Sequence, residues 1–199
     1  METAETICTF WFGTTTDDAT TIAEQSALWW SKRDEVDAAI RARFEPLVIQ
    51  AGDGHLDAWL HTPIGHLALI LLTDQFPRNI YRNDARAFAF DERALGWSNA
   101  AISRGIDRRC RPIERVFFYL PLEHSENRDD QAEAVRLFEA LATEVPPHVR
   151  PAFDGFADFA RRHREIVDRF GRFPHRNAAL GRVSTAEEAA FLRQPGSGF

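Results

Sequence analysis

The 199-residue chain has little cysteine and no long apolar run, and each absence argues against a class of protein. Its two cysteines, Cys8 and Cys110, form neither a disulfide framework nor a paired-cysteine metal motif, and such scarcity is typical of a reducing cytoplasm. The longest apolar run, residues 67–72, is far shorter than the roughly 20 residues of a membrane span. The N-terminus lacks the basic region that precedes the apolar part of a signal peptide. We therefore expect a cytoplasmic protein with no membrane partner.

Positive charge is also scarce, and nearly all of it is arginine. The 24 Lys and Arg residues are outnumbered by 30 Asp and Glu residues, which gives a net charge of −6. This balance argues against a nucleic-acid partner, because general nucleic-acid binders carry a basic surface. Lys32 is the only lysine. Arginine recognises carboxylates and phosphates through a planar, two-pronged contact, although GC-rich codon usage would explain the same excess without a function.

The chain has no segment of sustained polar–apolar alternation, so we expect little or no β-sheet. Apolar residues recur instead at the spacing of three or four that marks one face of a helix, as at Val36, Ile40, Phe44 and Leu47. The pattern predicts one all-α domain over residues 1–199. It would contain seven or eight antiparallel helices, arranged as a bundle or a helical array. The sequence does not specify an oligomeric state.

One unusual phrase occurs twice. Residues 74–79 read DQFPRN and residues 172–177 read RFPHRN, each after an apolar helical stretch. The residue before a proline is pushed out of the α conformation. Both phrases are therefore predicted to lie where a helix ends, with guanidinium and amide groups at the exit. For the same reason, a short helix from residue 111 is predicted to stop near Pro121.

Five longer blocks carry a resemblance to a known family. They are FWFG (10–13), LALILLTDQFPRNIYR (67–82), ARAFAFD (85–91), FFYLPLEHSE (117–126) and HREIVDRFGRFPHRNAALGR (163–182). In these blocks the chain resembles domain-of-unknown-function family 924. The resemblance implies an all-α fold similar to tetratricopeptide-like helical arrays, in a soluble and mostly bacterial protein, and it brings no biochemical activity. Thr73 and Asn83 depart from the commoner Leu and Gly of the family.

Arginine is concentrated near the second phrase. Residues 161–182 hold seven arginines against Glu165 and Asp168, so 7 − 2 = +5 in a chain of net charge −6. If the two phrases converge, their side chains could bind a small anionic ligand or an acidic peptide. The predicted ligand-binding residues are Arg78, Asn79, Arg82, Arg172, His175, Arg176 and Asn177. Alternatively, the arginines pair internally with Asp74, Glu123, Glu126 and Asp168 and only fix the packing.

A hydrolase is the rival hypothesis. Asp74 follows an apolar run, so it either pairs with Arg78 or Arg82, or has a raised pKa and acts as an acid or base. The candidate catalytic residues are Asp74, His124, Glu126 and His163, with His175 as an alternative to His163. The chain has no HExxH motif, cysteine pair or histidine pair at i, i+4, so no metal and no cofactor are predicted, although metal assistance stays open as a variant of the hydrolase hypothesis. A third hypothesis is a protein-interaction scaffold with an exposed apolar groove.

Overall fold

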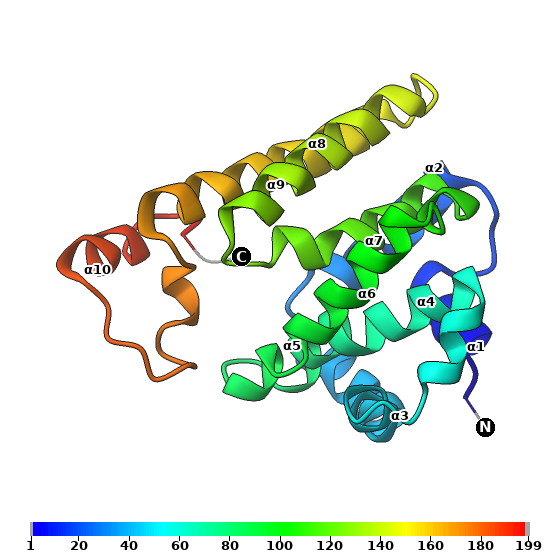
Figure 1. Cartoon of the computed structure of the whole chain (residues 1–199), viewed down its shortest axis with the longest axis horizontal. Helices are drawn as coiled ribbons and strands as arrows, with labels where there is room; N and C mark the ends of the chain where they lie inside the picture. Colours follow the sequence, from blue (N-terminus) through cyan, green and yellow to red (C-terminus); the bar gives the residue numbers. More distant parts are fainter. Residues whose placement is uncertain (1, 198–199) are drawn as a thin grey trace.

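The computed structural model describes residues 2–197, and in this range the chain forms helices and turns with no β-strand (Figure 1). The all-α prediction is confirmed, whereas the tetratricopeptide-like arrangement stays a prediction. The α-helices are α1 (Ala4–Phe12), α2 (Asp18–Trp30), α3 (Asp34–Gly52), α4 (Pro63–Ile70), α5 (Phe76–Ile80), α6 (Asp91–Ser103), α7 (Pro112–Glu123), α8 (Arg128–Glu144), α9 (Arg150–Phe170) and α10 (Ala186–Leu192). Short 3-10 turns lie at Asp57–His61, Ala85–Phe88, Asp107–Arg109 and Pro174–Arg176.

Helix α4 lies at the centre of the main core. The run Leu67–Leu72 is fully buried, as expected for a helix that is apolar on every side. Helices α1, α6 and α7 pack against α4, and α3 packs against the segment that follows it. Aromatic rings fill the space between them, including Trp11, Phe76 and Phe117, whose centroids lie 5.3–5.8 Å apart in neighbouring pairs. Across the described residues, no helix is both long and apolar enough to cross a bilayer.

Helices α8 and α9 form a long hairpin along one side of the molecule, and α10 projects beyond its end (Figure 1). Helix α9 ends at Gly171, whose φ of 70° is the left-handed conformation that glycine adopts at helix ends. We call residues 171–197 the C-terminal segment. It packs through a small second hydrophobic cluster in which Phe173 and Phe191 meet Ile166, Val167 and Phe170.

The first Phe-Pro phrase does not end a helix, contrary to the prediction. Helix α4 runs through a π-helical turn, Leu71–Gln75, directly into α5. Phe76 keeps α-helical angles (φ −62°, ψ −36°), and its N–H donates to the Leu71 carbonyl five residues back. The wider π turn removes the regular i−4 bonding that a proline would break, and Pro77 stands in the first turn of α5, where its missing N–H costs little.

Pro121 also fails to stop its helix, because α7 continues to Glu123. The residues on both sides of this proline, Leu120 and Leu122, are buried in the core. Packing of this kind compensates for the hydrogen bond that proline removes. The continuation matters for the site, because it places the last residues of α7 beside the π turn, which α7 contacts.

Candidate functional site

A buried polar cluster lies where the π turn meets the end of α7. Asp74, the fourth residue of the π turn, is fully buried. Its Oδ1 lies 2.7 Å from Nδ1 of His124, and its Oδ2 accepts a hydrogen bond of 2.6 Å from the Gln75 amide. π-Helical turns are rare and are frequently found at functional sites. We call Asp74 and His124 the dyad.

One member of the dyad is charged and the other is neutral. Burial alone would raise the pKa of Asp74, but the charge of Arg78 and the contacts with His124 and Gln75 outweigh it and lower that pKa. Burial and the charge of Arg78 lower the pKa of His124 despite the opposing effect of Asp74. At neutral pH the pair is therefore a carboxylate and a neutral imidazole. Nδ1–H then donates to Asp74, which leaves Nε2 as the ring nitrogen that can accept a proton.

Glu123 and His163 form a second buried pair beside the dyad. Glu123 is 4 % exposed, and Oε1 of its carboxyl lies 3.2 Å from Nδ1 of His163. Burial and the charge of Asp74 raise the pKa of Glu123 to about 8, so it is protonated at neutral pH. Burial and the proximity of His124 lower the pKa of His163 to about 3. The cluster thus holds an ionised carboxylate, a protonated carboxyl and neutral imidazoles in close proximity.

Two arginines, one from each Phe-Pro phrase, meet at this cluster. Arg78 pairs with Asp74 at 3.3 Å, as the sequence predicts, and grips Asp91 with both terminal nitrogens at 2.9 and 3.0 Å. Arg176 donates to the His124 carbonyl at 2.9 Å and to Asp91 at 3.4 Å. The two guanidinium groups therefore share the carboxylate of Asp91, which stands at the first position of α6.

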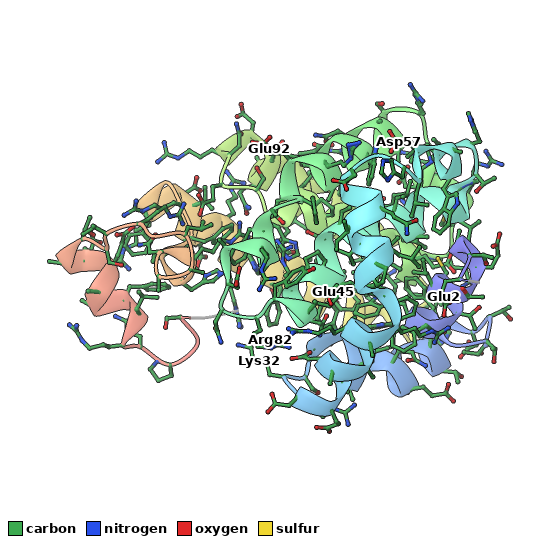
Figure 2. The ribbon with its side chains drawn as sticks, turned by 90° about the horizontal axis from the view of Figure 1, so that it is seen from below. Glu2, Lys32, Glu45, Asp57, Arg82 and Glu92 are labelled. Atoms are coloured by element: carbon green, nitrogen blue, oxygen red, sulfur yellow. The ribbon has the colours of Figure 1, made fainter. Side chains whose placement is uncertain are left out.

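The other two predicted arginines lie elsewhere, so the structure does not bring all four together. Arg82 follows the end of α5 and pairs with Asp37 of α3 through two hydrogen bonds of 2.8 Å. Figure 2 shows Arg82 beside the α3 ribbon. Asn79 donates to the same carboxylate at 2.9 Å. Arg172 pairs with Glu188 of α10 at 2.6 Å, so each of these two guanidinium groups has its own partner.

Three further predicted residues belong to the C-terminal segment or its attachment. Glu126 accepts a hydrogen bond of 2.7 Å from the Phe173 N–H and pairs with Arg182 at 2.6 Å. Asn177 donates to Ser184 at 3.0 Å. The His175 ring lies near that of Phe173, and burial together with the charge of Arg176 lowers the pKa of His175 to about 3. Glu126 thus attaches the segment to the rest of the chain, Asn177 bonds a residue within the segment, and His175 lies among the neutral imidazoles.

Asp91 is the site residue that sequence reasoning missed. The available signal was an acidic side chain at a helix start, and such residues ordinarily serve as caps or favourable charges in the first turn. Nothing in the spacing between Asp91 and either Phe-Pro phrase predicts that it lies between two guanidinium groups. Glu123 was foreseen only as an ion-pair partner, because burial, which raises its pKa, is a tertiary effect.

Within residues 2–197, the dyad is not part of a side-chain cluster arranged to hold a metal ion, and it does not line the pocket near α3. Among the described residues, no group of three or more His, Cys, Asp or Glu side chains is arranged to hold a metal ion. A pocket of about 380 Å³ lies instead between α3 and the end of α5, where Asp37, Arg41, Asn79 and Arg82 line it. Access to the cluster is through the side chains of His124, Arg78 and Asp91, which are 14 %, 21 % and 22 % exposed.

Comparison with known proteins gives the family. Residues 7–196 match the profile of a family described as bacterial protein of unknown function, DUF924. The chain belongs to the DUF924 family. This family assignment confirms the resemblance of the five sequence blocks. It carries no activity, so a function for this DUF924 protein has to come from its site.

A solved structure supports the same assignment. The chain is similar to a protein of unknown function, ATU0120, from Agrobacterium tumefaciens, with 36 % identity and a TM-score of 0.73. The similarity covers 89 % of this chain and 99 % of the Agrobacterium protein. No match was found among curated proteins.

Proposed function

We propose that this DUF924 protein is a cytoplasmic hydrolase in which His124, oriented by Asp74, is the general base. The proposal depends on one observation, the 2.7 Å contact between His124 Nδ1 and a fully buried Asp74 oxygen. A buried carboxylate fixes the tautomer and the orientation of an imidazole and stabilises the imidazolium that forms during proton transfer. The lowered pKa of His124 keeps the ring neutral and able to accept a proton at pH 7.

The proton balance of the reaction uses the two carboxyl groups differently. His124 Nε2 removes a proton from water as the water oxygen bonds to the electrophilic atom of the substrate. The bond to the leaving group breaks, and protonated Glu123 supplies the proton that the leaving group takes. The imidazolium proton then returns to the Glu123 carboxylate through solvent. Carboxyl groups whose environments separate their pKa values are the usual pattern of such acid–base assignments.

The substrate class that suits this site is a small molecule, or a peptide end, with an acidic group. Arg78 and Arg176 lie beside the dyad, and guanidinium groups bind carboxylate and phosphate through charge-assisted hydrogen bonds. This assignment keeps two members of the predicted arginine set and assigns Arg82 and Arg172 to structural pairs. No metal or cofactor takes part in the proposed reaction.

Replacement of His124 tests the proposal. His124→Asn keeps a donor for Asp74 but removes the base, so we expect hydrolysis of chromogenic phosphate or carboxyl esters to fall about 10²–10⁴-fold. The matched control is His66→Asn in α4, because His66 is also a buried histidine, with Nδ1 3.3 Å from the Thr62 carbonyl. A wild-type protein inactive across a panel of both ester classes, or a His124→Asn variant of full activity, would contradict the assignment.

A second candidate is a tetratricopeptide-like scaffold that binds another protein. The observation that favours it is the exposure of two aromatic side chains, Trp30 at 48 % and Phe159 at 50 %. Trp30 contacts Phe156, and Phe159 lies about one turn further along α9. A protein partner whose binding fails in a Trp30→Ser, Phe159→Ser variant, but survives His124→Asn, would support this function. Binding that is unchanged in the double variant would contradict it.

A further inference from the structure

The carboxylate of Asp91 lies between the two guanidinium groups of the cluster. Arg78 holds it with a two-pronged contact, while Arg176 reaches it at 3.4 Å, which is long for a charge-assisted hydrogen bond. One carboxylate group of the protein thus occupies the position that an acidic group of a substrate would take. Arg176 also bonds the carbonyl of His124, so this position adjoins the dyad.

The Arg176 guanidinium is held between two aromatic rings and has unused hydrogen-bonding capacity. The Arg176 guanidinium lies 4.8 Å from the ring centre of Phe88 and 4.5 Å from that of Phe173, and these contacts fix its plane. Arg176 is 7 % exposed, yet within residues 2–197 its Nε has no hydrogen-bond partner. A buried donor without an acceptor is rare and calls for an explanation.

Burial also disfavours the charge of the Arg176 guanidinium. Burial and the charge of Arg78 lower the pKa of Arg176 to about 10. A phosphate group offers more acceptor oxygens and more negative charge than the single carboxylate of Asp91, so it would satisfy both guanidinium groups better. Asp91 is able to move aside, because its side chain is 22 % exposed. It stands at the start of α6, where the helix dipole also favours a carboxylate that no longer contacts the arginines.

We propose that Arg78 and Arg176 form an oxyanion subsite for the phosphate or carboxylate group of the substrate, and that Asp91 occupies this subsite until the substrate displaces it. This proposal rests on the proposed function, because it takes the bound anion to be part of the molecule that is hydrolysed. The binding step is independent of the hydrolysis. Asp91 then sets a threshold for binding, because only an anion that bonds the two guanidinium groups better than a carboxylate of the protein can enter.

Binding of inorganic phosphate to Asp91→Asn tests the subsite. The amide cannot make the charged two-pronged contact, so we expect the dissociation constant for phosphate, measured by titration calorimetry, to fall about tenfold or more. The matched control is Asp37→Asn, because Asp37 makes an equally close two-pronged pair with a single arginine, Arg82. A control that gains as much phosphate affinity as Asp91→Asn would overturn the proposal.

Two further measurements complete the test. An acetate titration of Asp91→Asn separates a general oxyanion subsite, which binds both anions, from one that prefers phosphate. Arg176→Met in the Asp91→Asn background is expected to abolish the gain, and a retained gain would contradict the role of Arg176. If Asp91→Asn does not fold in buffer alone, phosphate should restore its thermal transition, and failure of up to molar phosphate to do so counts against the subsite.

The same variants distinguish the two proposals. Tight phosphate binding by Asp91→Asn in a protein that hydrolyses no ester would support the subsite and contradict the hydrolase. Loss of turnover in His124→Asn, without any change of phosphate affinity in Asp91→Asn, would support the hydrolase and contradict the subsite.

Discussion

Residues 71–80 and the C-terminal segment carry the same Phe-Pro pair in opposite settings. In the first region, Phe76 and Pro77 lie inside a continuous helical path and Phe76 packs among the aromatic rings of the main core. In the second, Phe173 and Pro174 follow a helix that has already ended at Gly171, and Phe173 packs in the small second cluster. One pair of residues is therefore part of the core, and the other belongs to an attached segment.

The difference explains which arginines meet. Arg78 is held in position by a buried helix, whereas Arg176 is positioned by stacking on Phe88 and Phe173 and by the ion pair between Glu126 and Arg182. The site thus combines a rigid half from the core with a half that depends on weaker attachment. Regions held by few buried contacts open more easily than the core.

The largest expected difference between the two regions is in the global stability lost when each phenylalanine is replaced by alanine. Phe76→Ala should lower the free energy of unfolding by about 3–5 kcal/mol, as a large cavity in a core does. Phe173→Ala should instead release the C-terminal segment locally, with little change in the urea midpoint of the main transition. Hydrogen exchange of residues 171–197 together with urea denaturation measures both. If both variants lost the same free energy of unfolding, the two phenylalanines would belong to one cooperative unit, and the proposed difference between the regions would be wrong.

The pH dependence of stability should also separate the two regions. Glu123, beside the π turn, has a folded pKa of about 8 against 4.5 unfolded, so the folded state alone holds its proton between these values and stability falls as pH rises. His175, in the C-terminal segment, has a folded pKa of about 3 against 6.5 unfolded, so its contribution is lost as pH falls through that window.

Of the contributions of Glu123 and His175 to stability, only that of Glu123 still changes with pH above pH 6.5. The wild-type free energy of unfolding should therefore decline toward pH 8 by at most about 1.4 kcal/mol per pH unit. Glu123→Gln, which cannot ionise, should lack this decline in urea denaturations at pH 6.5, 7.25 and 8. A variant that declines as steeply as wild type would show that Glu123 does not hold a proton in the folded protein.

The smallest expected effect is at Gly171, the left-handed residue that ends α9 ahead of the second Phe-Pro pair. Gly171→Ala should lower the free energy of unfolding by about 1–2 kcal/mol, because alanine strains the left-handed conformation. No atom lies within 4 Å of the added methyl group, so crowding does not contribute. The control is Gly155→Ala inside α9, where the space is also open and helix propensity predicts a gain of about 0.5–1 kcal/mol. Equal effects at the two glycines would contradict the assigned helix end.

Much of the fold could be predicted from the sequence because it depends on local periodicity. The buried run of α4 follows from its unbroken apolar residues. The apolar face of α9, with Phe153, Ala157 and Ala160 buried, follows from helical spacing, and its end at Gly171 follows from the backbone preference of glycine. The two prolines were misjudged for the opposite reason. Pro77 and Pro121 lie within helical paths because a π turn and core packing outweigh the local preference, and neither can be recognised without the tertiary structure.

The candidate site was predicted in part for the same reason. The pairing of Asp74 with Arg78 depends on a spacing of four residues, which the sequence shows directly. The dyad joins residues 50 positions apart, and Arg176 reaches Asp91 across 85 positions. Arg82 and Arg172 do not reach the cluster, because each pairs with another carboxylate, Asp37 or Glu188. The positions of these carboxylates depend on the fold.

The π turn also has a consequence for insertions and deletions in this part of the chain. Each residue of a helix advances it by about 100°, so a chain one residue shorter within Leu71–Gln75 could wind as a regular α-helix and remain in phase with α4. The residues after the turn would then keep their present directions, because a π turn holds one residue more than the α-helical turn it replaces, whereas residues inside the turn, Asp74 among them, would shift around the helix axis. Homologues with one residue fewer in this stretch would therefore keep the core and the direction of Arg78 while losing the carboxylate of the dyad from its place beside His124.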